Sequence, residues 1–382
     1  MTRHYLDHAS TSPLRPAAAA AIRAWLDGPV GDPGRVHEEG RTARAAVEEA
    51  RRQVATLLGV RPRQVVFTAG GTEAVNAAVW GATRAVPGGA VLCAPVEHSA
   101  VRQASERLAP VVALPVDRFG RLWVDGVTEA LLAAGAGGAT GPPPALVHCQ
   151  WANHEVGTVQ PVAEVVARCR QAGVPVHVDA AAAAGHVAMD LADLGADLVS
   201  VSAHKLGGPP GVGALVVRRG LRFEPLLVGG DQERGRRAGM ENVPAIAGFG
   251  AAAAALDPVT LAAEASDARR RTDRLLGSAL AVDGVDQVGD PDRRLAHLIC
   301  LGVAGVEAEP VLLGLDRAGI AAHSGSACSS ESLEPSPVLE AMGVDPSHSL
   351  RLSVGWSTVD AEVDAFCAAF PGVVADLRAL RS

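Results

Sequence analysis

The sequence predicts an α/β fold, with a large domain built on a mostly parallel mixed sheet and a smaller α+β domain. The first observation is an alternation of short apolar runs and helix-like segments between about residues 40 and 220. This alternation is typical of a parallel sheet covered by helices on both faces. The second observation is size: 382 residues, of which 48% are hydrophobic, are enough for a large core and more than one domain.

Seven short apolar runs are the expected strands, because turn or helix signals bound each of them. In chain order they cover residues 64–68, 90–94, 111–115, 145–150, 175–179, 198–202 and 213–218. A helix-like stretch at 38–52 precedes them, and an alanine-rich helix around 245–256 follows and ends near Asp257-Pro258. We therefore place a domain boundary there. Residues 16–256 form the large domain, and residues 1–15 join residues 257–382 in the small one.

The composition excludes several classes of protein. The net charge is −8 and the arginines are scattered among acids, so we expect no nucleic-acid binding. Residues 1–14 lack the apolar core of a signal peptide, and glycine, proline or charge breaks the longest apolar runs, so we expect no membrane span. Six cysteines without CxxC spacing indicate reduced thiols, a cytoplasmic location and no metal site.

Lys205 is the only lysine among 34 lysine and arginine residues. A position that stays lysine where arginine serves everywhere else indicates a need for an amine that loses its proton. Such an amine attacks carbonyls, so the first hypothesis is Schiff-base chemistry. The alternative is a compositional bias toward arginine that left one lysine by chance.

A glycine turn follows the expected strand at 64–68. Its residues, Ala69-Gly70-Gly71-Thr72-Glu73, lead into a helix-like segment. Free backbone amides at a helix N-terminus, with the Thr72 hydroxyl, suit a phosphate group. The alternative is an ordinary helix with Thr72 at or near its cap.

Asp179 ends the strand PVHVD and lies 26 residues before Lys205, which follows the strand LVSVSAHK. Two adjacent strands would therefore present a carboxylate and an amine at one edge of the sheet. Pyridoxal phosphate needs this arrangement, because a carboxylate keeps its ring nitrogen protonated while a lysine bonds its aldehyde carbon. Taken alone, Asp179 is equally well a strand-end turn residue.

Cys328 lies in a small, polar stretch, HSGSACSSE at 323–331, without a strand or helix pattern. A cysteine in such a loop is a candidate nucleophile. We expect the other five cysteines to be buried as small hydrophobic residues. They are Cys93, Cys149, Cys169, Cys300 and Cys367.

Motifs along nearly the whole chain resemble those of cysteine desulfurases, in the class V aminotransferase group of fold-type I pyridoxal-phosphate enzymes. The motifs are YLDHASTSP (5–13), FTAGGTEAVN (67–76), VEHSAV (96–101), WANHEVGTVQP (151–161), HVDA (177–180), SAHKLGGPPGVGAL (202–215), QERGRRAG (232–239), SGSACSS (324–330) and RLSVGWST (351–358). Residues 331–344, ESLEPSPVLEAMGV, resemble the long-loop subgroup, which hands sulfur to protein partners.

The resemblance implies roles for individual residues. Lys205 would bond the cofactor aldehyde, and Asp179 would hold the pyridine nitrogen. His98 would stack on one ring face and move protons, while Ala181 packs against the other face. Four residues would hold the phosphate: Gly71, Thr72, Ser202 and His204. Two residues would bind substrate: Arg351 as a bidentate clamp on its carboxylate, and Asn153.

Three departures from the family pattern concern the cofactor and substrate. His154 stands where the family usually has the second asparagine of ANNE, and we keep it among the cofactor-binding residues. Ala182 stands where DAxQ supplies a glutamine to the ring hydroxyl. Met240 stands where the SGT segment gives a threonine to the phosphate across the dimer.

The resemblance implies that the protein is an enzyme that converts L-cysteine to L-alanine and captures the sulfur as a persulfide on Cys328. A sulfur-acceptor protein, such as an iron–sulfur scaffold or a sulfur carrier, would then take the sulfur. We expect a homodimer, because fold-type I sites are built at subunit interfaces. The alternatives are a related C–S or C–Se lyase, acting on selenocysteine or another thio-amino acid, and a non-catalytic paralogue that binds a sulfur-carrier partner.

Overall fold

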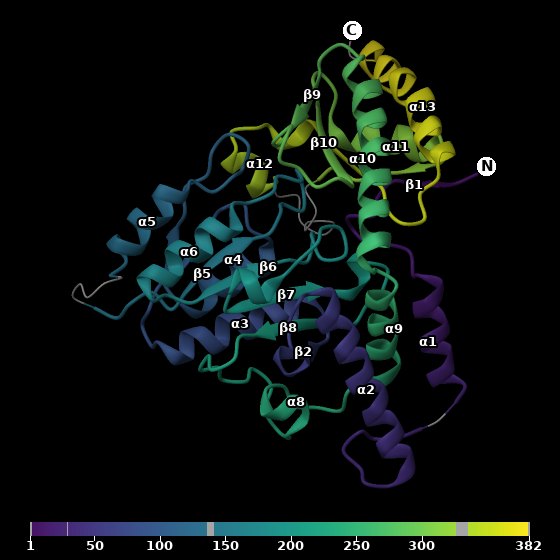
Figure 1. Cartoon of the computed structure of the whole chain (residues 1–382). Coiled ribbons are helices and arrows are strands. Elements are labelled where there is room, and N and C mark those ends of the chain that lie inside the picture. Colours follow the sequence, from purple (N-terminus) through teal and green to yellow (C-terminus); the bar gives the residue numbers. More distant parts are fainter. Residues whose placement is uncertain (1, 29, 136–140, 326–334, 381–382) are drawn as a thin grey trace.

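The computed structural model describes residues 2–28, 30–135, 141–325 and 335–380. Its main sheet has seven strands in the order β2-β8-β7-β6-β5-β3-β4 (Figure 1). The strands are β2 (Val65–Thr68), β3 (Val91–Cys93), β4 (Val111–Ala113), β5 (Leu146–Gln150), β6 (Val176–Asp179), β7 (Leu198–Ser202) and β8 (Gly213–Val217). All neighbours pair in parallel except those of β8, which runs antiparallel to both β2 and β7. The predicted mixed, mostly parallel sheet is confirmed.

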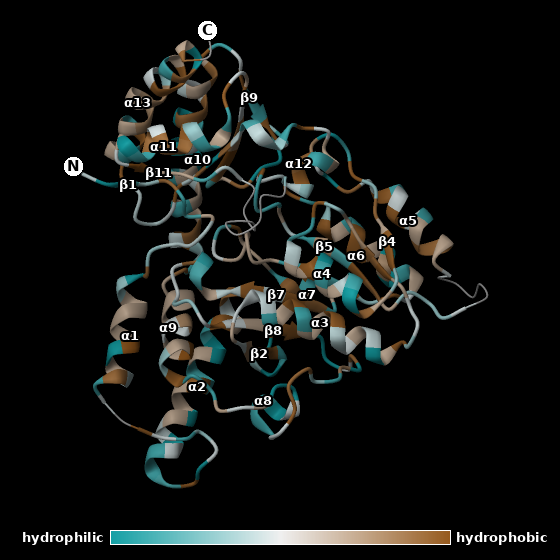
Figure 2. Cartoon of the chain, turned by 180° about the vertical axis from the view of Figure 1, so that it is seen from behind, coloured by the Kyte–Doolittle hydropathy of each residue, from teal (hydrophilic) through white to brown (hydrophobic). Residues whose placement is uncertain are grey.

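Helices cover both faces of this sheet, because side chains alternate between the faces along each strand. On β2, Val65 and Phe67 belong to one hydrophobic core and Val66 to another. Helices α3 (Gly71–Ala85) and α4 (Ser99–Leu108) pack on the second face. The first face is covered by α2 (Glu38–Leu57), α5 (Val124–Ala133), α6 (Val162–Ala172) and α9 (Val243–Ala254). Figure 2 shows the hydrophobic colouring of the strands between these layers.

Short elements complete the large unit. They are α1 (Pro16–Leu26), α7 (Leu191–Leu194), α8 (Gln232–Gly235), and the 3-10 turns η1 (Pro62–Gln64) and η2 (Ala203–Lys205). Helix α10 (Pro258–Leu280) begins with Asp257 as its cap and Pro258 in its first turn, which is where a proline fits a helix. In the described part of the chain, no single helix has the length and hydropathy to cross a membrane. Helices α9 and α10 pass that test only as a pair, which is bent by 79°.

A second sheet lies beyond α9, in the unit at the top of Figure 1. Its antiparallel order is β12-β10-β9, and a separate parallel pair joins β1 to β11. The elements are β1 (His4–Tyr5), β9 (Val285–Val288), β10 (Leu298–Val303), α11 (Ala308–Arg317), β11 (Ile320–Ala321), η3 (Pro346–His348), β12 (Ser349–Ser353) and α13 (Asp360–Ala379). Helix α12 (Pro337–Ala341) lies between β11 and η3 in the chain, but its Val338 and Leu339 belong to the core of the main sheet. The second sheet has its own core with Phe366 and Phe370. We propose that it is the predicted small domain.

The carboxyl ends of the parallel strands bring the predicted polar residues to one edge of the main sheet. In the strand register, Asp179 on β6 pairs with Gln150 on β5 and with Ser200 on β7. The glycine turn follows β2, and Lys205 ends η2 directly after β7. The small unit adds the segment after β1, and it adds Arg351 on β12.

Candidate active site

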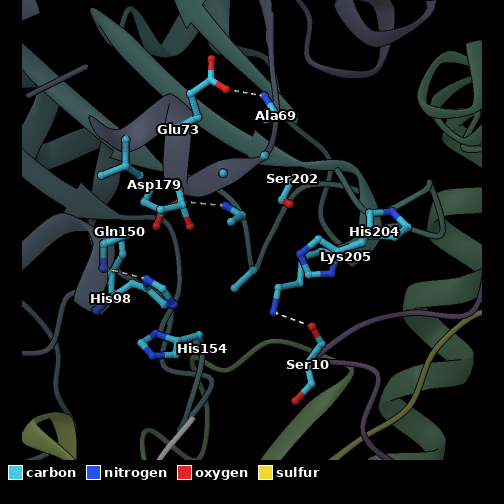
Figure 3. A pocket seen from close by; sticks show the side chains of 18 of the residues that line it. Ser10, Ala69, Glu73, His98, Gln150, His154, Asp179, Ser202, His204 and Lys205 are labelled. Carbon is cyan, nitrogen blue, oxygen red and sulfur yellow. Dashed lines mark hydrogen bonds between the residues drawn. The ribbon is translucent and has the colours of Figure 1, made fainter. Parts of the chain in front are cut away.

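A cavity of about 530 Å³ opens at this edge of the sheet. Figure 3 shows Asp179, Ser202 and Lys205 around it, with the rings of His98 and His154 on one side. The predicted residues that line it are Gly71, Thr72, His98, His154, Asp179, Ala181, Ser202, His204, Lys205 and Arg351. Asn153 is fully buried and does not line the cavity. Cys328 lies outside the described residues.

Lys205 reaches into the cavity from η2, at the end of a fully buried strand. Its Nζ donates hydrogen bonds to the carbonyl oxygens of Ala9 and Ser10, the latter at 3.0 Å. The backbone of the lysine is also held, because Nε2 of His186 donates to the Lys205 carbonyl at 3.1 Å. The N-terminal segment therefore supplies polar partners that position the amine.

Asp179 presents a carboxylate that is already oriented. Its Oδ1 accepts hydrogen bonds from the Ser200 hydroxyl at 2.9 Å and from the Ala181 backbone N–H at 3.0 Å. Among the described residues, these are the hydrogen bonds that the carboxylate makes, so Oδ2 remains for a ligand. A carboxylate held on one oxygen is suited to receive a protonated ring nitrogen on the other.

The glycine turn forms a close cradle at the N-terminus of α3. The Ala69 N–H donates to Oε2 of Glu73 at 2.8 Å, and Arg237 in turn pairs with Glu73 at 2.9 Å. A Cβ added at Gly71 would lie 3.4 Å from the Cβ of Ser202, so the turn packs directly against the end of β7. The free amides and dipole of this 15-residue helix favour an anion. This part of the cavity fits a phosphate group.

His98 and His154 form the side wall of the cavity. Their ring centroids are 4.9 Å apart and the rings meet edge to face, at 64°. Nδ1 of His98 accepts a hydrogen bond from the Ala100 N–H at 3.1 Å, so His98 is also the cap of α4. Burial lowers the pKa of His154, and the neighbouring Glu155 opposes that shift. The neutral form of His154 is therefore favoured.

Asn153 braces this wall from behind. Its Nδ2 donates to the Val96 carbonyl at 3.0 Å, and its Oδ1 accepts from the N–H of Glu155 at 2.8 Å. These bonds join the loop before His98 to the turn that carries His154. Asn153 was predicted to bind substrate; the structure places its amide in this buried brace, and the substrate contact stays a prediction.

Arg351 closes the cavity from the small unit. Its Nη2 donates to Asp7 at 2.9 Å and to the Ser10 hydroxyl at 2.6 Å, and its Nη1 donates to the His154 carbonyl at 2.9 Å. The side chain is about 1% exposed, and its Nε has no hydrogen-bond partner among the described residues. A buried guanidinium with an unsatisfied N–H indicates a site for an anionic ligand.

Of the residues that depart from the family pattern, Ala182 lies in the cavity and Met240 lies outside it. Ala182 lines the cavity, where its methyl group offers no hydrogen bond to a ligand. Met240 is 62% exposed and lies outside this cavity. No group of three or more histidine, cysteine or acidic side chains in the described part of the chain is arranged to hold a metal ion.

Sequence reasoning missed several residues that support the site. They are Asp7, Ser10, Glu73, Glu97 and Ser200. Ser200 could have been found, because it stands two residues before Ser202 on the same strand and so faces the same side. Glu97 is fully buried, and burial raises its pKa to about 8. Its Oε1 accepts from the Gln150 N–H at 2.7 Å, an anchor that no sequence pattern indicates.

Comparisons with known proteins agree with this geometry. The family model for aminotransferase class-V matches residues 4–366. A cysteine desulfurase of Trichormus azollae is 40% identical over 98% of this chain and 94% of its own length. An IscS-like cysteine desulfurase of Mycobacterium tuberculosis is 41% identical over 98% of this chain and 97% of its own length.

Solved structures extend the comparison to three dimensions. A NifS-like protein, 27% identical, superposes with a TM-score of 0.89 over 98% of this chain and 100% of its own. SspA in complex with cysteine, 26% identical, gives a TM-score of 0.80 over 93% of this chain and 100% of its own. The chain therefore belongs to the aminotransferase class-V family, whose members depend in general on pyridoxal phosphate.

Proposed function

We propose that the protein is a pyridoxal-phosphate-dependent cysteine desulfurase, which converts L-cysteine to L-alanine and transfers the sulfur to Cys328 as a persulfide. The observation that carries this proposal is that one cavity is lined by Lys205, the only lysine of the sequence, by the oriented carboxylate of Asp179 and by the N-terminus of α3. The relatives named cysteine desulfurase support the choice of reaction.

The residues of the cavity fit the cofactor. Lys205 would bond its aldehyde carbon, and Asp179 would hold its ring nitrogen. The phosphate would lie on the α3 N-terminus, with hydroxyl and imidazole groups around it from Thr72, Ser202 and His204. Burial lowers the pKa of His204 to about 4, so this ring is neutral at pH 7. When bound, pyridoxal phosphate supplies an electron sink for charge that develops at the substrate α-carbon.

Arg351 binds and orients the substrate in this proposal. The Arg351 side chain lines the cavity, and its guanidinium would bind the cysteine carboxylate there. Asp7 and Ser10 hold the guanidinium in place from the other side. With the carboxylate held by Arg351, the amine of Lys205, which lines the same cavity, would be the base that takes the α-proton.

Sulfur transfer follows from the balance of bonds. The thiolate of Cys328 attacks the substrate sulfur, so the C–S bond breaks and an S–S bond forms. One proton leaves the accepting thiol and one reaches the carbon that becomes the alanine methyl group. Gly325, three residues before Cys328, supports this role: a Cβ added there would lie 3.9 Å from the Cβ of Arg351. Gly325, the last described residue before Cys328, thus lies beside Arg351, which lines the cavity.

The proposal includes an acceptor protein, a homodimer and a cytoplasmic location. The segment around Met240 supports the dimer, because Leu227, Val228 and Met240 expose 41%, 79% and 62% of their surface. Apolar side chains gathered in one short segment are typical of an interaction surface. The acceptor would take the persulfide from Cys328.

The experiment that tests the proposal measures L-alanine and persulfide after adding L-cysteine. The wild-type protein should form both in equal amounts. Cys328→Ser should form no persulfide, yet still change the visible spectrum of the cofactor when cysteine binds. Cys367→Ser is the control, because Cys367 is only partly buried and packs in the small core, away from the cavity. Persulfide on Cys367 or Cys300 in the wild type would contradict the proposal.

A second candidate is a C–S or C–Se lyase for a different amino acid. His154 and Ala182 favour it, because both line the cavity and depart from the family pattern. Comparing turnover of L-cysteine, selenocysteine and larger thio-amino acids decides between the two. A clear preference for one of the others would replace L-cysteine as the substrate.

A further inference from the structure

The proposed reaction needs a group that moves a proton on the substrate side of the cavity. His98 is the obvious imidazole, but its ring already caps α4. Nδ1 of His98 accepts from the Ala100 N–H at 3.1 Å, so a neutral ring carries its proton on Nε2. A second proton on His98 would have to bind Nδ1. The hydrogen bond from the Ala100 N–H would then be lost, and two N–H groups would face each other. The cap therefore restrains His98 as a base.

His154 stands next to it without this restraint. Its ring lies edge to face with the ring of His98 (Figure 3). It lines the same cavity as Lys205 and Arg351. Nε2 of His154 is 3.4 Å from Oε1 of Glu155. A ring that directs Nε2–H to a carboxylate keeps a lone pair on Nδ1, and no described residue hydrogen-bonds to that atom.

Glu155 is itself fixed, so it is able to orient the ring. It is about 4% exposed, and its Oε2 accepts a hydrogen bond from the Ser336 hydroxyl at 2.5 Å. Its backbone N–H donates to Asn153, the brace described above. A histidine whose second nitrogen faces a buried carboxylate is the arrangement in which an imidazole base is held in one tautomer.

We infer that His154, oriented by Glu155, is a further catalytic residue that carries the proton between the accepting thiol and the product carbon. This inference rests on the proposed function. Nδ1 takes the proton that leaves the thiol as the S–S bond forms, and delivers it to the carbon whose C–S bond has broken. The Cys328 sulfur and the substrate sulfur are each oxidised by one electron as the S–S bond forms, and that carbon is reduced by two, so the step needs no external oxidant or reductant.

The groups around His154 shift its pKa in opposite directions. Burial, His98 and Arg351 lower its pKa, whereas Glu155 raises it. The carboxylate thus supports the transient positive charge that the other neighbours oppose. Removing the carboxylate leaves only the lowering influences, so the pKa of His154 should fall.

The experiment compares His154→Gln and Glu155→Gln with a matched control. His348→Asn is the control, because Nε2 of His348 is 3.6 Å from Oδ2 of Asp345 in a similar pair, on η3. In holoprotein, His154→Gln should lower kcat by about 100-fold or more, the contribution of one general base, and change KM little. Glu155→Gln should lower kcat and move the acidic limb of the pH profile to lower pH. His348→Asn should change neither.

A second measurement does not depend on turnover. In holoprotein with 15N-labelled histidine, the resonances that disappear in His154→Gln identify the His154 ring. The titration midpoint of this ring should move to lower pH in Glu155→Gln and stay in place in His348→Asn. An unchanged midpoint in Glu155→Gln overturns the dyad, whatever the kcat of His154→Gln.

The outcomes separate this inference from the proposed function. If wild-type protein forms no alanine from cysteine, the proposed function fails. If it forms alanine, and His154→Gln keeps the wild-type kcat and acidic limb, the proposed function stands and the inference is overturned. Loss of the acidic limb in His98→Gln but not in His154→Gln would assign the proton to His98.

Discussion

The Ser200 hydroxyl donates a hydrogen bond to Oδ1 of Asp179 at 2.9 Å, and the two residues are paired in the register of neighbouring strands. The sheet itself therefore orients the carboxylate. Because Ser200 lies on β7, which leads directly into η2 and Lys205, one strand positions both the carboxylate partner and the amine. Ser200 acts through Asp179 and is thus a positioning residue.

Removing the Ser200 hydroxyl should weaken retention of the cofactor. Ser200→Ala removes one hydrogen bond to Asp179, worth about 1 kcal/mol, or roughly fivefold in affinity. The dissociation rate of pyridoxal phosphate from the purified protein measures this. Ser105→Ala is the control, because Ser105 is also buried and its hydroxyl also makes one hydrogen bond, to the Val101 carbonyl in α4. Equal rates in the two variants would show that Ser200 does not orient Asp179.

Removing the Glu73 carboxylate should loosen the phosphate cradle. Glu73→Ala deletes the acceptor of the Ala69 N–H and the partner of Arg237. Since hydrogen bonds to charged groups are stronger than neutral ones, we expect roughly a tenfold rise in the Kd for pyridoxal phosphate. Equilibrium titration of the apoprotein measures it, with the exposed Glu106→Ala on α4 as control. An unchanged Kd would mean that the turn holds its shape without Glu73.

Apolar patterning was sufficient to predict the strands of the main sheet. The expected run at 198–202 coincides with β7, and the expected run at 145–150 contains β5. The direction of β8 was not predictable, because a strand buried on both faces has the same apolar composition in either direction. Its position between β2 and β7 depends on long-range pairing that no local segment specifies.

The site was predictable where a residue's type was unusual or where a motif carried it. Lys205 was identified by its uniqueness and Asp179 by its place at a strand end, and both line the cavity. The motif position of Asn153 predicted a substrate contact, which stays a prediction; what the motif did not indicate is that the Asn153 amide joins two loops behind the cavity wall. Ser10 was missed because it contacts Lys205 and Arg351 only after the two units of the chain come together.

Replacing the only lysine should remove the covalently held cofactor. In Lys205→Arg, the guanidinium keeps the positive charge but does not lose its proton at working pH, so it forms no bond to an aldehyde. The visible absorbance of the purified protein should disappear. The control is a Lys205→Arg, Arg219→Lys double variant, which restores one lysine at an exposed position after β8. Retained absorbance in either variant would contradict the role of Lys205.

Buried histidines should make the protein acid-labile between pH 6.5 and 4. Burial lowers the pKa of both His177 and His186 from 6.5 to about 4. Between these values the unfolded chain binds a proton that the folded chain does not, so the free energy of unfolding falls as pH falls. Each such histidine contributes up to about 1.4 kcal/mol per pH unit to the free energy of unfolding, and its contribution is fully present above pH 6.5.

Urea unfolding at a series of pH values measures the slope of the free energy of unfolding against pH. His186→Asn should reduce the slope by one proton, whereas His37→Asn, with a side chain 57% exposed, should leave it unchanged. An identical slope in His186→Asn would mean that His186 is protonated equally in the folded and unfolded chains.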